Sequence, residues 1–215
     1  MQDARPTQPP ARGHFIALEG GEGAGKSRLQ SALGERLAGD GHDVVLTREP
    51  GGTPLGEQIR ALVLNQRAVE TDLAELLLFE AARAQLVATI IQPAFARGAL
   101  VICDRFTASS TAYQAFGRGL AREVVERANA IAAGGVTPDL TLLLDVAVEV
   151  GIARRAADGG ANHFDRETIG FHERVRAGYH DLARGDATWR IIDASRPFED
   201  VLADAIAAIR KLIGP

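Results

Sequence analysis

Short apolar runs alternate along the chain with longer segments whose apolar positions recur every three or four residues. The runs predict strands at 14–19, 43–47, 99–104, 139–145 and 189–193. The longer segments predict helices at 26–40, 54–64, 70–97, 107–116, 120–134, 147–157, 167–185 and 197–213. Runs without polar alternation are typical of strands buried on both faces, and the helices between them are long enough for crossovers. The pattern predicts a three-layer α/β fold with a five-stranded parallel sheet and helices on both faces.

The same pattern predicts one domain over 14–215. The 215 residues are 46% hydrophobic, which is enough for a core without disulfides. Residues 1–13 hold three prolines among polar residues, so we expect a disordered leader. The glycine-rich, polar stretch at 158–166 predicts an exposed, mobile loop, and we expect a small lid over about 155–167.

The composition of the chain limits which binding partners and which cellular compartment we expect. The formal net charge of −4 argues against a uniformly basic nucleic-acid-binding protein. No run approaches the roughly 18 apolar residues of a membrane span, so we expect no membrane partner. Cys103 is the single cysteine of the chain, which favours a reducing compartment and predicts a cytoplasmic protein.

A glycine-rich motif follows the first predicted strand and leads into a helix. It satisfies the pattern G-x-x-x-x-G-K-[ST] and comprises Gly20, Gly21, Glu22, Gly23, Ala24, Gly25, Lys26 and Ser27. The backbone N–H groups of such a loop cradle phosphates, while Lys26 reaches the β/γ-phosphates and Ser27 offers its hydroxyl to Mg²⁺. The motif predicts binding of ATP with Mg²⁺.

The motif excludes some nucleotide-binding classes and leaves others open. A dinucleotide fingerprint starting at Gly21 would need glycine where Lys26 stands, which argues against NAD. A guanine-specific N-K-x-D motif is absent from the sequence, which excludes a GTPase. A nucleoside or nucleotide monophosphate kinase and a regulatory P-loop ATPase both remain compatible with the loop alone.

One charge interrupts the apolar stripe of the helix predicted at 70–97. Arg83 shares its face with Phe79 and Leu86. A buried, unpaired guanidinium is costly, so Arg83 must reach solvent, find a carboxylate, or line a polar cleft that takes a ligand. Phe79 lies one turn earlier, so a flat aromatic face and a planar donor could address one heterocycle together.

Two charged residues follow the strand predicted at 99–104. Asp104 ends this strand and Arg105 follows it, at the sheet edge where the phosphate loop is expected. An acidic residue there can hold a Mg²⁺-bound water, and an arginine can clamp a phosphate. Arg60 is predicted on a helix near the same edge, with a solvated surface arginine as the structural alternative.

Several motifs together carry a family resemblance. FIALEGGEGAGKS, TREPGGT, LLLFEAARAQ, DRFTASSTAYQ, TPDLTLLLDV and IDASRP occur in this order between residue 14 and the C-terminal region. In this set the chain resembles the bacterial thymidylate kinase family. The resemblance implies transfer of the γ-phosphoryl group of ATP to dTMP in a homodimeric enzyme. The rivals are another monophosphate kinase and, from a different class, a regulatory ATPase.

The resemblance also implies roles for individual residues on the dTMP side. Arg60 and Arg105 match arginines that hold the acceptor 5′-phosphate. Phe79 matches the aromatic residue that stacks on thymine, and Arg83 matches the arginine that hydrogen-bonds the base. The other matches are Glu22 near the sugar 3′-hydroxyl, Tyr113 as a residue that disfavours ribose, Ser110 near the base edge, and Pro50 in the pocket wall.

On the ATP side, Arg154 matches an arginine close to adenine. Relatives without an arginine in the phosphate loop take a catalytic arginine from the lid, and here Arg155 or Arg166 would supply it. The expected catalytic set is therefore Lys26, Asp104, Arg105, Arg155 and Arg166, with Ser27 and Asp104 at the metal.

Overall fold

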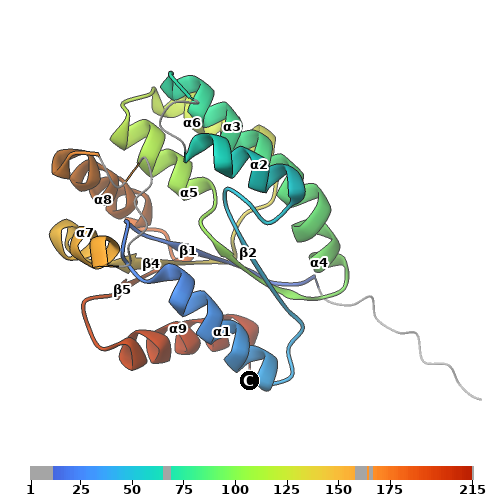
Figure 1. Cartoon of the computed structure of the whole chain (residues 1–215). Coiled ribbons are helices and arrows are strands. Elements are labelled where there is room, and N and C mark those ends of the chain that lie inside the picture. Colours follow the sequence, from blue (N-terminus) through green and yellow to red (C-terminus); the bar gives the residue numbers. More distant parts are fainter. Residues whose placement is uncertain (1–11, 65–68, 158–163, 165–166, 215) are drawn as a thin grey trace, which may run out of the picture.

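The computed structural model describes residues 12–64, 69–157, 164 and 167–214 (Figure 1). Nearly all of the predicted leader lies outside this part of the chain. Its last residue, Gly13, is buried and donates its N–H to the carbonyl of Phe95 at 3.3 Å, so Gly13 belongs to the packed domain. None of the described helices has the length and apolar character needed to cross a membrane.

Five parallel strands form one sheet, as predicted. They are β1 (Phe15–Glu19), β2 (Val44–Arg48), β3 (Leu100–Asp104), β4 (Leu140–Asp145) and β5 (Trp189–Asp193), in the order β2-β3-β1-β4-β5. The prediction that all five are buried on both faces is wrong for the edge strands β2 and β5. Leu46 is 43% exposed and Ile191 is 52% exposed, because an edge strand has a neighbour on one side only.

Helices cover both faces of the sheet (Figure 1). They are α1 (Lys26–Gly39), α2 (Pro54–Val63), α3 (Asp72–Leu86), α4 (Gln92–Ala96), α5 (Thr107–Ser110), α6 (Arg122–Ala133), α7 (Val148–Ala157), α8 (Ile169–Ala183) and α9 (Phe198–Ile213), with π-helical turns η1 (Val87–Ile91) and η2 (Thr111–Gly117). Alternate residues of β1 reach opposite layers. Ile16 and Leu18 pack with α1 and α9, whereas Phe15 and Ala17 pack with residues of α3, η1 and α4.

Two predicted helices differ from the observed ones in their regularity. The segment predicted at 70–97 divides into α3, η1 and α4, and the segment predicted at 107–116 divides into α5 and η2. Pro93 lies in the first turn of α4, directly after η1, and has no N–H to donate to the preceding turn. The regular i to i−4 hydrogen-bond pattern therefore cannot continue unbroken through this residue.

Candidate active site

The phosphate loop connects β1 to α1. Gly20, Gly23 and Gly25 have positive φ angles, which lets the loop turn back over the first residues of α1. Lys26 opens this helix, and its Nζ donates to the carbonyls of Gly20 at 3.0 Å and Gly21 at 2.8 Å. Burial, reinforced by repulsion from Arg105, lowers the pKa of Lys26 to about 8. The lysine is thus desolvated and held over the loop before any phosphate arrives.

Ser27 and Asp104 meet at the end of β3. The Ser27 hydroxyl donates to Asp104 Oδ2 at 2.8 Å. A hydroxyl beside a carboxylate gives the hard oxygen ligands that Mg²⁺ prefers, and Mg²⁺ keeps several waters and substrate oxygens as its remaining ligands. The described residues contain no group of three or more His, Cys, Asp or Glu side chains arranged for a metal. This pair therefore fits a metal that arrives with a nucleotide.

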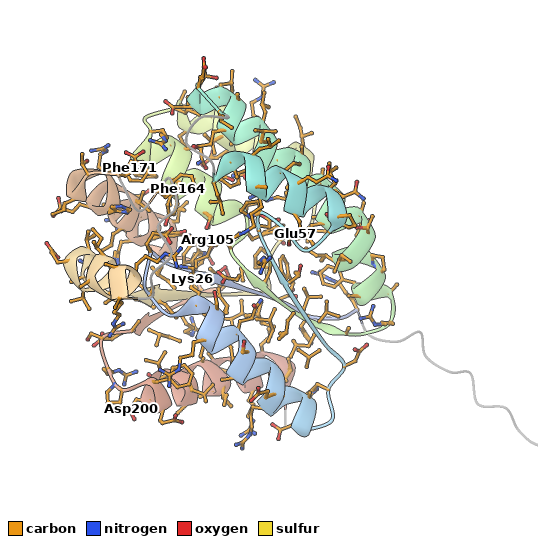
Figure 2. All side chains as sticks on the ribbon, viewed as in Figure 1. Lys26, Glu57, Arg105, Phe164, Phe171 and Asp200 are labelled. Carbon is orange, nitrogen blue, oxygen red and sulfur yellow. The ribbon has the colours of Figure 1, made fainter. Side chains whose placement is uncertain are left out.

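A first cavity extends from the phosphate loop to the ends of β2 and β3. Lys26 and Arg105, which lie near each other in Figure 2, both line it. Besides most of the loop, it is lined by Arg28, Arg48, Glu49, Arg60, Asp104, Arg105 and Arg155. Arginine and lysine side chains thus gather around the position where phosphates would lie.

A second cavity adjoins the first. It is lined by Glu22, Glu49, Pro50, Arg60, Leu64, Phe79, Arg83, Arg105, Ser109, Ser110, Tyr113, Gln114 and Phe164. All eight residues that the resemblance places around dTMP are among these lining residues. The two cavities share Glu22, Glu49, Arg60 and Arg105, so a ligand in one can meet a ligand in the other at these side chains.

Arg105 occupies this junction in an unusual backbone conformation. Its φ angle of 74° is rare for a residue other than glycine. Its Nη2 donates to Glu22 Oε1 at 2.9 Å and to the Tyr113 hydroxyl at 3.1 Å, and Tyr113 donates to the same Glu22 oxygen at 2.8 Å. Burial alone would raise the pKa of Glu22, but Arg105 and Lys26 outweigh burial and lower it to about 2. Glu22 is therefore ionised at neutral pH.

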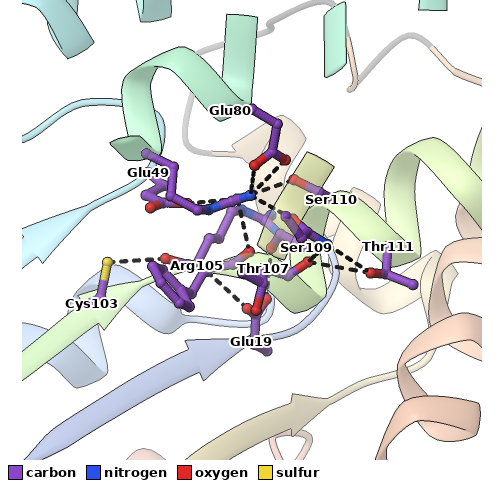
Figure 3. Close-up of polar contacts among 12 residues, drawn as sticks. Glu19, Glu49, Glu80, Cys103, Arg105, Thr107, Ser109, Ser110 and Thr111 are labelled. Atoms are coloured by element: carbon purple, nitrogen blue, oxygen red, sulfur yellow. Dashed lines mark hydrogen bonds and ion pairs between the residues drawn. The ribbon is translucent and has the colours of Figure 1, made fainter. Parts of the chain in front are cut away.

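Arg83 is 2% exposed, which excludes a guanidinium that reaches solvent. Its Nε donates to Glu49 Oε2 at 2.8 Å, and its Nη1 donates to Glu80 Oε1 at 2.6 Å (Figure 3). The same side chain also donates to Asn129 and Ser110 while it lines the second cavity. Of the three alternatives, Arg83 thus combines two, because it is paired with carboxylates at the wall of a cleft.

Glu49 links this network to both cavities. Burial raises its pKa to about 7, although the ion pair with Arg83 opposes that shift. Its Oε1 is buried and has no hydrogen-bond partner among the described residues. An unpaired buried oxygen at a cavity wall is a potential contact for a bound ligand.

Phe79 and Arg60 form another part of the wall. The Phe79 ring lies 6.3 Å, centroid to centroid, from that of Phe164, at an interplanar angle of 42°. Arg60 Nη1 donates to the carbonyl of Pro50 at 3.0 Å, and the Glu49–Pro50 peptide bond is cis. Arg60 is therefore directed into the site, in contrast to the solvated alternative.

The predicted lid is described in part. Arg155 lines the first cavity, and Arg154 Nη1 donates to the carbonyl of Ala194 at 2.9 Å, in the loop IDASRP. Arg166 lies outside the described residues, as does most of 158–166. The prediction of an exposed loop is wrong at Phe164, which is 6% exposed because its ring packs against Tyr113 at 5.6 Å.

Sequence reasoning did not include five lining residues, namely Glu49, Leu64, Ser109, Gln114 and Phe164. A signal was present for four of them. Ser109 lies four residues before Tyr113, and Gln114 lies four residues after Ser110, a spacing that places residues near the same face of a helical segment. Leu64 lies four residues after Arg60, and Glu49 directly precedes Pro50. Phe164 comes from a separate segment that only the tertiary structure brings to this wall.

Comparisons with known proteins agree with this geometry. A family model described as thymidylate kinase matches residues 18–205. A thymidylate kinase of Thermomicrobium roseum is 50% identical over 196 residues, which cover 90% of this chain and 92% of the relative. Those of Desulfovibrio desulfuricans and Deinococcus radiodurans are 48% and 44% identical over 204 and 200 residues, which cover 91% and 93% of this chain and 94% and 97% of the relatives.

Proposed function

The chain belongs to the thymidylate kinase family, and from that premise we propose which of its residues carry out the reaction. The enzyme transfers the γ-phosphoryl group of ATP to dTMP, giving dTDP and ADP. The junction of the two cavities at Arg105 and Glu22 is the observation that best supports our assignment. A phosphate donor on one side and a phosphate acceptor on the other would meet there.

The first cavity binds ATP. The loop N–H groups and Lys26 hold the β/γ-phosphates, and Ser27 with Asp104 would hold Mg²⁺, which supplies charge neutralisation between the phosphates. Arg154 lies beside the adenine ring, a position that its contact with Ala194 supports. Arg155, at the cavity wall, approaches the transferred group, and Arg166 is a second candidate from the lid.

The second cavity binds dTMP. Phe79 stacks on the base while Arg83 and Ser110 contact its edge, and Pro50 forms the wall beside it. Glu22 and Tyr113 face the sugar. Arg60 and Arg105 hold the 5′-phosphate at the junction, which is why both line the two cavities.

The chemistry needs little from the protein beyond placement and charge. An oxygen of the dTMP phosphate forms a bond to the γ-phosphorus as the bond to the β–γ bridging oxygen breaks. The acceptor is already an anionic nucleophile, so no general base is required. Lys26 and Arg105 stabilise the charge that the two phosphates share in the transition state.

A coupled ADP-release assay with Mg²⁺-ATP tests the assignment. We expect turnover with dTMP well above that with dUMP, UMP, CMP, AMP or thymidine, and dTDP as the product. ADP release that is independent of the acceptor would instead indicate a regulatory ATPase, and preference for another monophosphate would indicate a related kinase. The AAR and TREPGGT motifs and the aromatic wall of the second cavity favour neither alternative.

We further propose that the enzyme acts as a homodimer in the cytoplasm, where ATP is abundant. Leu73 and Leu77 on α3 are 48% and 55% exposed, and Ile131 on α6, which packs against α3, is 83% exposed. Apolar side chains exposed on neighbouring helices suit a contact with a second copy. Sedimentation equilibrium of the wild type and of Leu77→Glu would test this proposal, since the variant should dissociate at lower protein concentrations than the wild type.

A further inference from the structure

A buried carboxylate lies beneath Arg105 without lining either of the two cavities. Glu19 ends β1 and is 0% exposed. Its Oε2 accepts the hydroxyl of Ser109 at 2.6 Å (Figure 3). Its Oε1 accepts the N–H of Phe106 at 2.8 Å, and its Oε2 also accepts the hydroxyl of Tyr179 at 3.0 Å. A buried carboxylate is costly, and these three donors compensate part of that cost.

The first of these hydrogen bonds fixes the backbone around Arg105. The left-handed φ angle of Arg105 persists only where neighbouring contacts determine it. The N–H of Arg105 donates to the carbonyl of Leu18 at 2.9 Å, and the next N–H along the chain is the one that Glu19 accepts. The two peptide groups that flank the strained residue are therefore both anchored to the end of β1.

The other two hydrogen bonds orient the guanidinium. Arg105 Nη1 donates to Ser109 Oγ at 3.2 Å and to the Tyr179 hydroxyl at 3.1 Å. A hydroxyl has one proton, so when Ser109 and Tyr179 donate to Glu19, their lone pairs remain free to accept from Arg105. The two hydroxyl oxygens also lie 2.8 Å apart, and either can donate to the other. The carboxylate therefore draws the proton of at least one hydroxyl away from the guanidinium, and in this way contributes to the position of Nη1.

From these contacts we propose that Glu19 is a positioning residue for the dTMP phosphate, which acts through Phe106, Ser109 and Tyr179 on Arg105 and touches no substrate itself. This inference rests on the proposed role of Arg105 as a ligand of the 5′-phosphate. Glu19 comes from β1 and Tyr179 comes from α8, so Arg105 is held between two elements that are far apart in the sequence.

Comparing dTMP with thymidine isolates the effect, because the two ligands differ only in the 5′-phosphate. We expect Glu19→Gln to reduce the ratio of the thymidine Kd to the dTMP Kd about tenfold or more in calorimetric titrations, with the thymidine Kd itself unchanged. The glutamine amide would donate where the carboxylate accepts. At least one hydroxyl would then turn its proton toward the guanidinium and displace it.

Glu80→Gln is the matched control. Glu80 is also a buried carboxylate, 5% exposed, but it pairs with Arg83 at the proposed base site. Its loss should weaken thymidine and dTMP binding alike and leave the ratio unchanged. Damage to the fold would also weaken both ligands together, so only a loss confined to dTMP supports positioning by Glu19.

The remaining outcomes are decisive. If Glu19→Gln folds and the ratio of the thymidine Kd to the dTMP Kd is unchanged, the inference is overturned. If that variant does not fold, the same ratio is measured in Tyr179→Phe, where a fall supports the inference and an unchanged value overturns it. Arg105→Lys separates the two levels of the argument. If Arg105→Lys keeps the wild-type ratio of the two Kd values, Arg105 does not bind the 5′-phosphate as proposed. If the ratio falls in Arg105→Lys but stays at the wild-type value in Glu19→Gln and Tyr179→Phe, only the role of Glu19 is refuted.

Discussion

Arg105 and Glu22 form an ion pair at 2.9 Å where the two cavities of the enzyme meet. Both residues line both cavities, so in our assignment the pair connects the ATP side to the dTMP side. The Tyr113 hydroxyl completes the group, since it contacts both charged side chains. Its oxygen therefore cannot move aside easily when a sugar enters the second cavity.

This restraint leads to a prediction about sugar selectivity. Tyr113→Phe removes the hydroxyl that, in our assignment, lies beside the 2′ position, and with it a contact held in place by Glu22 and Arg105. We expect the kcat/KM preference for dUMP over UMP to fall about tenfold, which corresponds to one hydrogen-bonding group of about 1.4 kcal/mol. The two substrates differ only at the 2′ position, so initial rates with each report the effect directly.

Tyr179→Phe provides the control for this prediction. It removes a hydroxyl that accepts from Nη1 of Arg105, whereas Tyr113 accepts from Nη2, and Tyr179 does not line the second cavity. The preference for dUMP should stay at the wild-type value in this variant. Equal changes in both tyrosine variants would contradict a role of Tyr113 at the sugar and would point to Arg105 as the common cause.

The buried network around Arg83 predicts a large effect on stability. Arg83→Leu leaves Glu49 and Glu80 buried without their shared cation, a change that typically costs about 3 to 5 kcal/mol of unfolding free energy. Urea unfolding monitored by circular dichroism would measure this cost. Adding Glu49→Gln and Glu80→Gln to the same chain should restore part of the loss, because no unpaired buried charge remains. If the unfolding free energy of Arg83→Leu alone lies within about 1 kcal/mol of the wild-type value, the network does not stabilise the fold as we expect.

The Arg83 network also shows where sequence reasoning ends. The apolar stripe identified Arg83 as exceptional, because one charge in a helical face of period 3.6 is visible in the sequence. Glu80 lies three residues before it on the same helix, but the partners Glu49 and Asn129 were not visible, since they lie 34 and 46 residues away along the chain. Such pairings depend on how helices and loops pack, which no local pattern contains.

The helices and strands could be predicted from their apolar patterns. Helix hydrogen bonds join residues that are close in the sequence, and the parallel pairing of the strands follows from the crossover helices between them. The phosphate loop was predictable for the same reason, as its chemistry lies within eight consecutive residues. Phe164 was not, because a polar, glycine-rich context predicted exposure while the aromatic ring packs against Tyr113. Edge exposure of β2 and β5 also depends on strand order, which the runs themselves do not reveal.

The contact between Ser27 and Asp104 predicts a shared role in magnesium use. Ser27→Ala and Asp104→Asn should each raise the free Mg²⁺ concentration for half-maximal rate about tenfold or more and change the KM for dTMP little. Initial rates at fixed ATP over a range of free Mg²⁺ give this value. Ser31→Ala, one turn further along α1, removes a hydroxyl that donates to the carbonyl of Ser27 and does not line the first cavity, so this variant serves as the control. Unchanged magnesium dependence in both site variants would refute the assignment.

The lowered pKa of Lys26 predicts that nucleotide binding takes up a proton in alkaline solution. Without ligand the pKa of Lys26 is about 8, below its ordinary value of 10.5, so the Lys26 side chain loses its charge as the pH rises through 8. Bound phosphates favour the ammonium form and raise the pKa again. At pH 8.5 about three-quarters of the free sites are uncharged and must gain a proton on binding.

Calorimetric titration of ADP at pH 8.5 in buffers of different ionisation enthalpy would measure that uptake. We expect the ADP Kd to rise toward tenfold per pH unit above pH 8, because only the charged lysine binds phosphate well. Lys26→Arg keeps its charge throughout this range, so its nucleotide binding should show neither proton uptake nor this pH dependence. The same uptake in the arginine variant would assign the titration to another group, and would mean that Lys26 stays charged despite its burial.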